Sequence, residues 1–88
     1  MQGVVVRVAI PDFEASRKVL VDQVVPRVSQ LPGFVAGYWL KAGDHSGLSI
    51  VVFESEETAR TAAGVVRENA PETVTVESVE VLDVVASA

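Results

Sequence analysis

The spacing of apolar residues along the chain switches between the two periods that mark strands and helices. Residues 4–10 form a short β-branched run that ends at Pro11, and this length and composition indicate a strand. Apart from Arg7 the run is apolar on both faces. We therefore expect this strand in the middle of a sheet, covered on both sides.

The segment that follows has helical spacing. Asp12 is a suitable N-cap, and the residues that then recur on one helical face are apolar, namely Phe13, Leu20, Val24, Val28 and Leu31. Pro26 lies inside this pattern and removes an intrahelical hydrogen bond, so the helix must kink or restart there. The pair Pro32-Gly33 is a turn signal that ends the helix.

Two further strands are expected at residues 34–41 and 48–54. Between them, residues 42–47 include two glycines, an aspartate and a serine, and this turn chemistry predicts a hairpin. Tyr38 and Trp39 are neighbours on the first of these strands. Their rings should therefore point to opposite faces of the sheet.

A second helix and a last strand complete the pattern. Ser55 can cap the helix, whose first turn carries two glutamates, the charge that a helix amino end favours. A stripe of small residues follows, and Ala70-Pro71 ends the helix. Between residues 73 and 85 apolar positions alternate, but the phase slips by one near Glu77-Ser78, which predicts a β-bulge or a break.

These elements predict an α+β fold for a single domain that spans residues 1–88. Their βαββαβ order is that of the ferredoxin-like fold, in which two helices pack on one face of a four-stranded antiparallel sheet. The other face of the sheet is left without helices. In this chain that face cannot be polar, because several strands carry apolar residues at positions that point to each of the two faces. We therefore expect a homodimer in which two copies pair sheet to sheet.

Composition supports the need for such a partner surface. The hydrophobic fraction is 49% and the chain holds twenty valines, whereas a domain this small buries only about 60–65% of its unfolded surface. The absence of cysteine excludes disulfides, thiolate metal sites and cysteine nucleophiles. A net charge of −5 with seven scattered basic residues argues against nucleic acid and anionic membranes as partners.

The sequence gives no sign of membrane insertion or export. No apolar run approaches the roughly 18 residues that a membrane span needs. The amino terminus lacks the basic start and long apolar stretch of a signal peptide. We therefore expect a cytoplasmic protein.

Three runs of residues carry a family resemblance: 31–34 (LPGF) after the first helix, the pair 38–39 (YW), and 51–57 (VVFESEE) before the alanine-rich helix. They resemble the dimeric α+β barrel superfamily, in particular antibiotic biosynthesis monooxygenase-like domains. The resemblance covers nearly the whole chain. It implies a homodimer whose two sheets form a barrel, with a small cleft in each subunit between the sheet and the helices. Its characterised members include cofactor-independent oxygenases of polycyclic phenols and haem-degrading enzymes.

The sequence departs from the haem-degrading members. They use an asparagine on the first strand with a tryptophan and a histidine later in the chain. Here the only asparagine is Asn69, at the end of the second helix, and the only histidine, His45, falls in the hairpin turn. That triad cannot be carried over, and we expect no cofactor. The chain is also short for the family and its hairpin is compact, so we do not expect a large ligand pocket.

Arg7 is the first candidate for binding a ligand. It is a charge in an otherwise apolar strand, and a buried arginine demands a carboxylate or several carbonyl partners. Glu54, Glu77 or Glu80 could supply the carboxylate, across the sheet or between subunits. The alternative is a site for an anion or a phenolate.

Tyr38, Trp39 and Phe53 are the aromatic candidates. Packing in the core or an interface accounts for such rings, and we expect Phe53 in the core. The alternative is an aromatic wall for a flat hydrophobic ligand, with the phenol or the indole N–H as a hydrogen-bond donor. His45 lies in a polar turn, where we expect it exposed, and one histidine with scattered carboxylates gives no metal-ligand spacing.

Three functions remain open at this point. The first is a dimeric barrel that binds a small apolar or aromatic molecule or serves as an interaction module, because no catalytic constellation is visible. The second, which the resemblance implies, is a cofactor-independent monooxygenase of phenolic or polycyclic substrates, in which Tyr38 and Trp39 orient the substrate and Arg7 stabilises phenolate charge. The third is an isomerase or decarboxylase that uses the same cleft. A cavity beside Tyr38 or Trp39 smaller than about 100 Å³ would favour the interaction module.

Overall fold

Strands and helices follow one another in the order that the sequence predicts. The computed structural model describes residues 1–68 and 74–88. The elements in these ranges are β1 (Gln2–Ala9), α1 (Phe13–Val19), the π-helix η1 (Leu20–Val24), α2 (Val25–Ser29), β2 (Phe34–Lys41), β3 (Ser46–Phe53), α3 (Glu56–Glu68) and β4 (Thr75–Asp83). The expected helix end at Ala70-Pro71 lies outside the described residues. No helix in the described ranges is long and apolar enough to cross a membrane.

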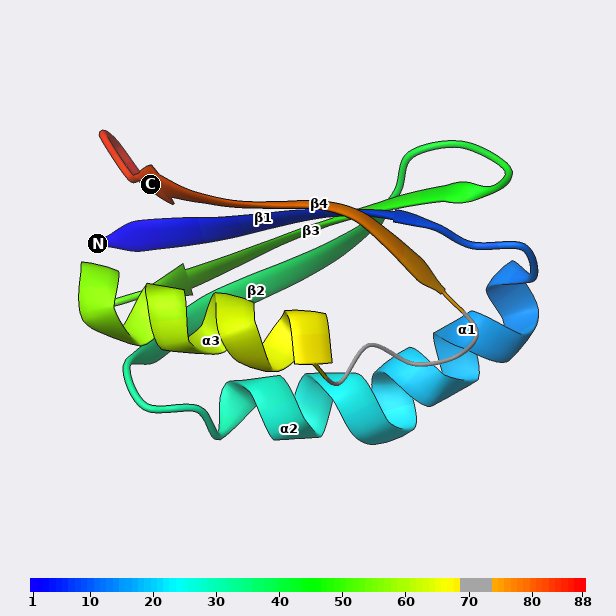
Figure 1. Ribbon diagram of the computed structural model, residues 1–88, viewed down its shortest axis with the longest axis horizontal. Coiled ribbons are helices and arrows are strands. Elements are labelled where there is room, and N and C mark those ends of the chain that lie inside the picture. Colours follow the sequence, from blue (N-terminus) through cyan, green and yellow to red (C-terminus); the bar gives the residue numbers. More distant parts are fainter. Residues whose placement is uncertain (69–73) are drawn as a thin grey trace.

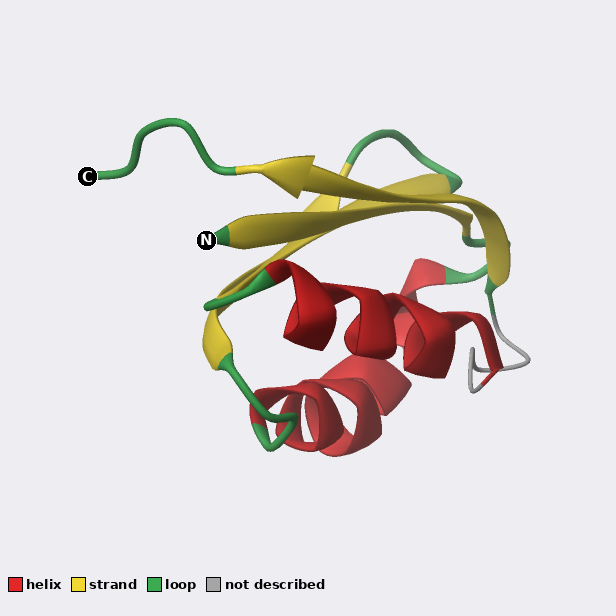
Figure 2. Cartoon of the chain, turned by 60° about the vertical axis from the view of Figure 1, so that its left-hand side comes forward, coloured by secondary structure: helices red, strands yellow, loops and turns green. Residues whose placement is uncertain are grey.

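The strands form one four-stranded antiparallel sheet in the order β2-β3-β1-β4. All the helical segments lie against one face of this sheet, and no helix covers the other face (Figures 1 and 2). This arrangement confirms the α+β, ferredoxin-like fold. It also confirms that β1 is an interior strand, because β1 pairs with β3 on one side and β4 on the other.

The core lies between the sheet and the helices. Val4 pairs with Val51 across β1 and β3, and both are buried on the face that meets the helices, which we call the inner face. Phe53 is 1% exposed there, as expected for a core residue. Helix α3 contributes buried alanines to the same cluster, at positions 59, 62 and 63. Because these side chains are small, α3 lies close to the sheet.

The first helical region is continuous but contains a wider turn. Asp12 caps α1, since its carboxylate accepts hydrogen bonds from the backbone N–H of Glu14 at 3.1 Å and of Ala15 at 3.3 Å. The Val25 N–H donates to the carbonyl of Leu20, five residues earlier, and α2 then begins with proline in its first turn. The restart expected from Pro26 is therefore confirmed. The π-helix places the proline, which has no N–H, at a point where the chain begins a new helix.

Helix α3 and the turn before β2 meet at one tight contact. Ser55 caps α3, because its hydroxyl accepts the backbone N–H of Thr58 at 3.2 Å. Gly33 has a φ of 78°, and a Cβ built on it would lie 2.6 Å from Oγ1 of Thr58. The turn at residues 32–33 therefore requires glycine for its backbone angle and for space. In addition, the backbone N–H of Glu54 donates to the Gly33 carbonyl at 2.8 Å.

Two irregularities interrupt the strand pairing. Between β1 and β4, Arg7 pairs with Ser78 whereas Val8 pairs with Val76, so Glu77 is the extra residue. This confirms the phase slip predicted near residues 77–78. A second shift lies in β2 beside Val35, and the alternation in the sequence gave no sign of it. Extra residues of this kind bend a strand and increase its twist.

Candidate functional site

A cavity of about 710 Å³ lies between the inner face of the sheet and the helices. Its wall combines residues of all four strands with residues of α1, η1, α2 and α3, and valine is the commonest residue in it. The expectation that a large pocket is absent was therefore wrong. The wall includes several short side chains that do not fill the space the layers enclose, among them Val24, Val25 and Ser49.

The cavity has a buried end and an open end. Val4, Val28 and Phe53 line it and are buried, so they mark the closed end. The exposed lining residues come instead from α1, η1 and the end of β2, and they are Glu14, Arg17, Val21, Leu40 and Lys41. We call this open end the mouth. In Figure 1, α1 lies near the end of the sheet that carries the β2–β3 hairpin.

Trp39 contributes the largest ring to the cavity wall. A Cβ built on Gly37 would lie 2.8 Å from Cη2 and 2.9 Å from Cζ3 of the indole, so the ring covers the backbone of Gly37. Beside it, Phe34 and Phe53 meet edge to face, with ring centres 6.2 Å apart. The indole N–H has no hydrogen-bond acceptor among residues 1–68 and 74–88. The indole N–H is therefore a donor that the described part of the chain does not use.

The polar groups of the cavity are few. Ser16 is buried in the wall at 6% exposure, and Ser49 lies on the inner face of β3. The charged lining residues are Glu14, Arg17 and Lys41. The Lys41 ammonium lies 5.0 Å from the centre of the Phe13 ring, which places Lys41 beside the start of α1. A largely apolar wall with a few polar groups is the usual character of a small-molecule site.

The sheet separates the four candidate residues into two pairs. Trp39 and Phe53 line the cavity, whereas Arg7 and Tyr38 do not. Tyr38 is 61% exposed, and it pairs with Ile50 on the face without helices, which we call the outer face. This confirms that Tyr38 and Trp39 point to opposite faces. In a single chain, Arg7 and Tyr38 cannot act on a molecule bound beside Trp39.

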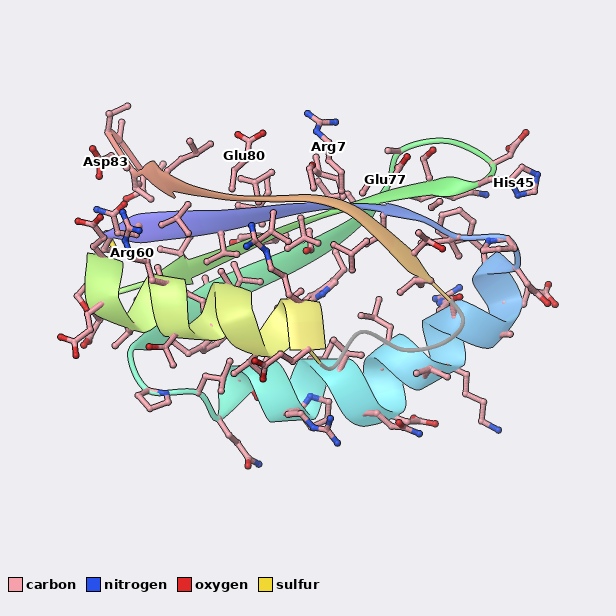
Figure 3. All side chains as sticks on the ribbon, in the orientation of Figure 1. Arg7, His45, Arg60, Glu77, Glu80 and Asp83 are labelled. Atoms are coloured by element: carbon pink, nitrogen blue, oxygen red, sulfur yellow. The ribbon has the colours of Figure 1, made fainter. Side chains whose placement is uncertain are left out.

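Arg7 is exposed, so the expectation of a buried charge was wrong for the single chain. Its side chain points away from the helices, as does that of Glu80 (Figure 3). Neither Glu54, Glu77 nor Glu80 forms an ion pair with Arg7 in the described part of the chain. The cause is the alternation of the strand: Val6 and Val8 face the helices, which leaves Arg7 on the outer face. An ion pair between subunits stays a prediction.

His45 is exposed in the hairpin loop, as expected, and it does not line the cavity (Figure 3). Its backbone carbonyl accepts the N–H of Ile10 at 2.8 Å, so the residue has a structural contact with the end of β1. Among the described residues, no three or more histidine, cysteine, aspartate or glutamate side chains lie together as metal ligands.

Sequence reasoning missed four residues of the site. Arg17 and Lys41 lie at the mouth. Gly37 makes room for the indole, and a Cβ on Gly47 would lie 2.7 Å from Cδ1 of Ile10. A glycine inside a strand is a known sign of a close approach. Gly37 also precedes Trp39 by two positions, so it shares its face, and this signal was present in the sequence.

Comparison with known proteins gives the fold a context. Neither protein-family models nor curated proteins match the chain. Among solved structures, SnoaB, a cofactor-independent oxygenase from Streptomyces nogalater, superposes with a TM-score of 0.71 at 18% identity, over 98% of this chain and 94% of that one. The chain shares the fold of this structure. The ferredoxin-like fold that the resemblance to antibiotic biosynthesis monooxygenase-like domains implied is thereby confirmed.

Two further structures have the same fold. NE2512, a protein of unknown function from Nitrosomonas europaea, gives a TM-score of 0.70 at 22% identity and covers 99% of this chain and 91% of that one. A dimeric ferredoxin-like protein from an uncultured marine organism gives 0.66 at 12% identity, over 100% and 98% of the two chains. The identities are low, so these likenesses establish the architecture and leave the activity to the residues of the site.

Proposed function

We propose that the protein binds a small apolar or aromatic molecule in the cavity beside Trp39. The observation that supports this proposal is the cavity itself, whose volume of about 710 Å³ lies within the range of about 300–1,000 Å³ usual for ligand sites. Its wall is mainly apolar, and Trp39 adds a flat ring with an unpaired N–H. A ligand would restore the packing contacts that side chains around an empty space lack.

The outer face supports the second part of the proposal, which is a homodimer paired sheet to sheet. Tyr38 is 61% and Leu82 49% exposed on the face of the sheet that no helix covers in Figure 2. Val5 and Ile50 pair with each other on the same face. An apolar face of this kind marks an interaction surface. A second copy of the chain carries the same apolar face, so two copies could cover each other in a twofold interface.

Fluorescence titration tests the ligand site directly. Trp39 is the only tryptophan in the chain and lines the cavity, so a dye bound there accepts energy from it, and the variants below test whether the dye lies in the cavity. We expect N-phenyl-1-naphthylamine, a neutral aromatic dye, to bind saturably with such transfer. Val24→Phe places a ring in the cavity wall and should weaken binding at least about tenfold by occupying part of the space.

Val35→Phe is the matched control, because Val35 is 46% exposed and does not line the cavity. Its affinity for the dye should equal that of the unmodified chain. Circular dichroism confirms that both variants fold. Equal weakening in the two variants, or no saturable energy transfer from Trp39, would contradict the ligand site.

A second candidate function is a cofactor-independent monooxygenase. The observation that favours it is the shared fold with SnoaB, together with a cavity that can hold a flat substrate beside Trp39. With an anthrone, the reaction would convert the ring CH2 group and one O2 into a carbonyl group and one water molecule. The protein would stabilise the substrate carbanion and keep bulk water out of the cavity while O2 reacts.

Oxygen uptake with anthrone tests this candidate. We expect one O2 consumed per substrate, a slower rate in Trp39→Phe, and an unchanged rate in Tyr38→Phe, which alters the neighbouring ring on the outer face. Uptake no faster than in buffer would exclude the anthrone oxygenase. Equal effects of the two variants would exclude the cavity as its site.

A further inference from the structure

We infer that the ligand carries an acidic group beside its apolar body, and that Arg17 and Lys41 bind this group at the mouth of the cavity. This inference rests on the proposed function and adds the charge and the orientation of the ligand. It concerns the mouth, where the charged lining residues lie. At the buried end the ligand contacts the apolar wall.

The structure brings the two cations together from distant parts of the chain. Arg17 follows Phe13 by four residues on α1, so their side chains share one helical face. The Lys41 ammonium lies 5.0 Å from the centre of the Phe13 ring. Phe13 therefore neighbours both cations, and all three residues line the cavity.

The mouth is positive although the chain is acidic. The chain carries a net charge of −5, and its cations number seven. Arg17 and Lys41, two of these seven, meet a single carboxylate in the cavity wall, that of Glu14. The mouth therefore has an excess of one positive charge. A local excess that opposes the net charge concentrates anions at that point of the surface.

Neither cation forms an ion pair with another residue that the structure describes. Within residues 1–68 and 74–88, the one ion pair joins Arg60 to Glu56 on α3, away from the mouth. The guanidinium of Arg17 can thus offer two parallel N–H donors to a carboxylate, and the Lys41 ammonium can add a third donor. The ligand would then lie with its rings toward the buried end and its acid toward α1.

A pair of dyes that differ in one charge tests the inference. N-Phenyl-1-naphthylamine is neutral, and 8-anilino-1-naphthalenesulfonate has the same ring system with an added sulfonate. Energy transfer from Trp39 measures the dissociation constant of each. We expect Arg17→Gln and Lys41→Gln each to weaken the anionic dye about three- to fivefold, and the double variant about tenfold or more. The neutral dye should change less than about twofold, since its contacts are apolar.

The double variant Lys18→Gln/Arg27→Gln is the matched control. It makes the same change in net charge, but neither residue lines the cavity, so both dyes should bind as they do to the unmodified chain. The inference is overturned if the Arg17/Lys41 double variant keeps its affinity for the anionic dye, or loses affinity for both dyes equally. In either case saturable binding of the neutral dye would leave the proposed function standing. If neither dye accepts energy from Trp39 in the unmodified chain, both proposals are overturned together.

Discussion

Replacing Gly37 with alanine should destabilise the protein and displace Trp39. The new methyl group would lie 2.8 Å from Cη2 and 2.9 Å from Cζ3 of the indole, and 3.4 Å from Cε2 of Phe34. Carbon atoms in good contact lie about 3.5–4.0 Å apart, so the ring must move by nearly 1 Å. The backbone itself accepts alanine, because the positive φ among the described residues belongs to Gly33.

The magnitude follows from the cost of overpacking. Forcing an extra carbon into a packed site costs about 1–3 kcal/mol. In a domain of this size each kcal/mol corresponds to about 4–8 °C in Tm, so Tm should fall by about 4 °C or more. Without the clash the substitution would stabilise the protein, because alanine in place of glycine inside a helix or strand adds about 0.5–1 kcal/mol to the unfolding free energy.

Gly64→Ala is the matched control. Gly64 lies inside α3, and no atom lies within 4 Å of the Cβ that alanine would add. This variant should gain about 0.5–1 kcal/mol from helix propensity. Glycine to alanine is therefore expected to destabilise the protein at position 37 and to stabilise it at position 64.

Thermal unfolding followed by circular dichroism measures both variants, and tryptophan emission reports on the displacement of Trp39. In a Trp39→Val background the clash is removed, so Gly37→Ala should no longer destabilise the protein. A Gly37→Ala variant as stable as the unmodified chain, with unchanged emission, would refute the placement of the indole over Gly37.

Three further predictions concern the cap of α3, its surface and the outer face. Ser55→Ala should lower the unfolding free energy by about 1 kcal/mol in urea titrations, because the Thr58 N–H loses its acceptor; an unchanged midpoint would contradict the cap. Arg60→Ala removes an exposed ion pair to Glu56 at 2.6 Å. It should lower the unfolding free energy by less than about 0.5 kcal/mol in the same assay, and a larger decrease would indicate a further structural role for Arg60. Ile50→Lys places a charge on the outer face. In analytical ultracentrifugation this variant should sediment as a folded monomer of 9.3 kDa, whereas the unmodified chain should sediment as a dimer. An unmodified chain that already sediments at 9.3 kDa would disprove the dimer.

The fold could be predicted from the sequence because each element carries a local signal. The turn signals at residues 32–33 and 42–47 bounded the strand predicted at 34–41, which is where β2 lies, and Pro26 marked the point where the helix restarts. The apolarity of β1 indicated its interior position in the strand order, because an edge strand would leave it exposed. The bulge at Glu77 was visible as a change of phase, since a strand keeps a strict period of two.

The site could be predicted only in part, because periodicity gives the face of a side chain and not the space around it. Trp39 was assigned a face opposite to Tyr38, but the sequence did not say which ring meets the helices. The cavity depends on how far apart α1, η1 and the sheet lie, which local patterns do not encode. Arg17 shows the same limit: its helical position is exposed, yet the end of β2 brings Lys41 to the same mouth.

The sheet also decides which cation can serve a catalytic site. A role for Arg7 in stabilising phenolate charge requires a substrate on the outer face, since its side chain and the cavity lie on opposite sides of β1. A homodimer paired through that face would bring Arg7 into the interface, where a partner carboxylate such as that of Glu80 is the simplest counterion. A phenolate in the cavity would instead be within reach of the mouth, so an oxygenase on this chain would rely on Arg17 and Lys41. Loss of oxygenase activity in Arg7→Gln, with an intact dimer and unchanged binding of both dyes, would reverse this assignment.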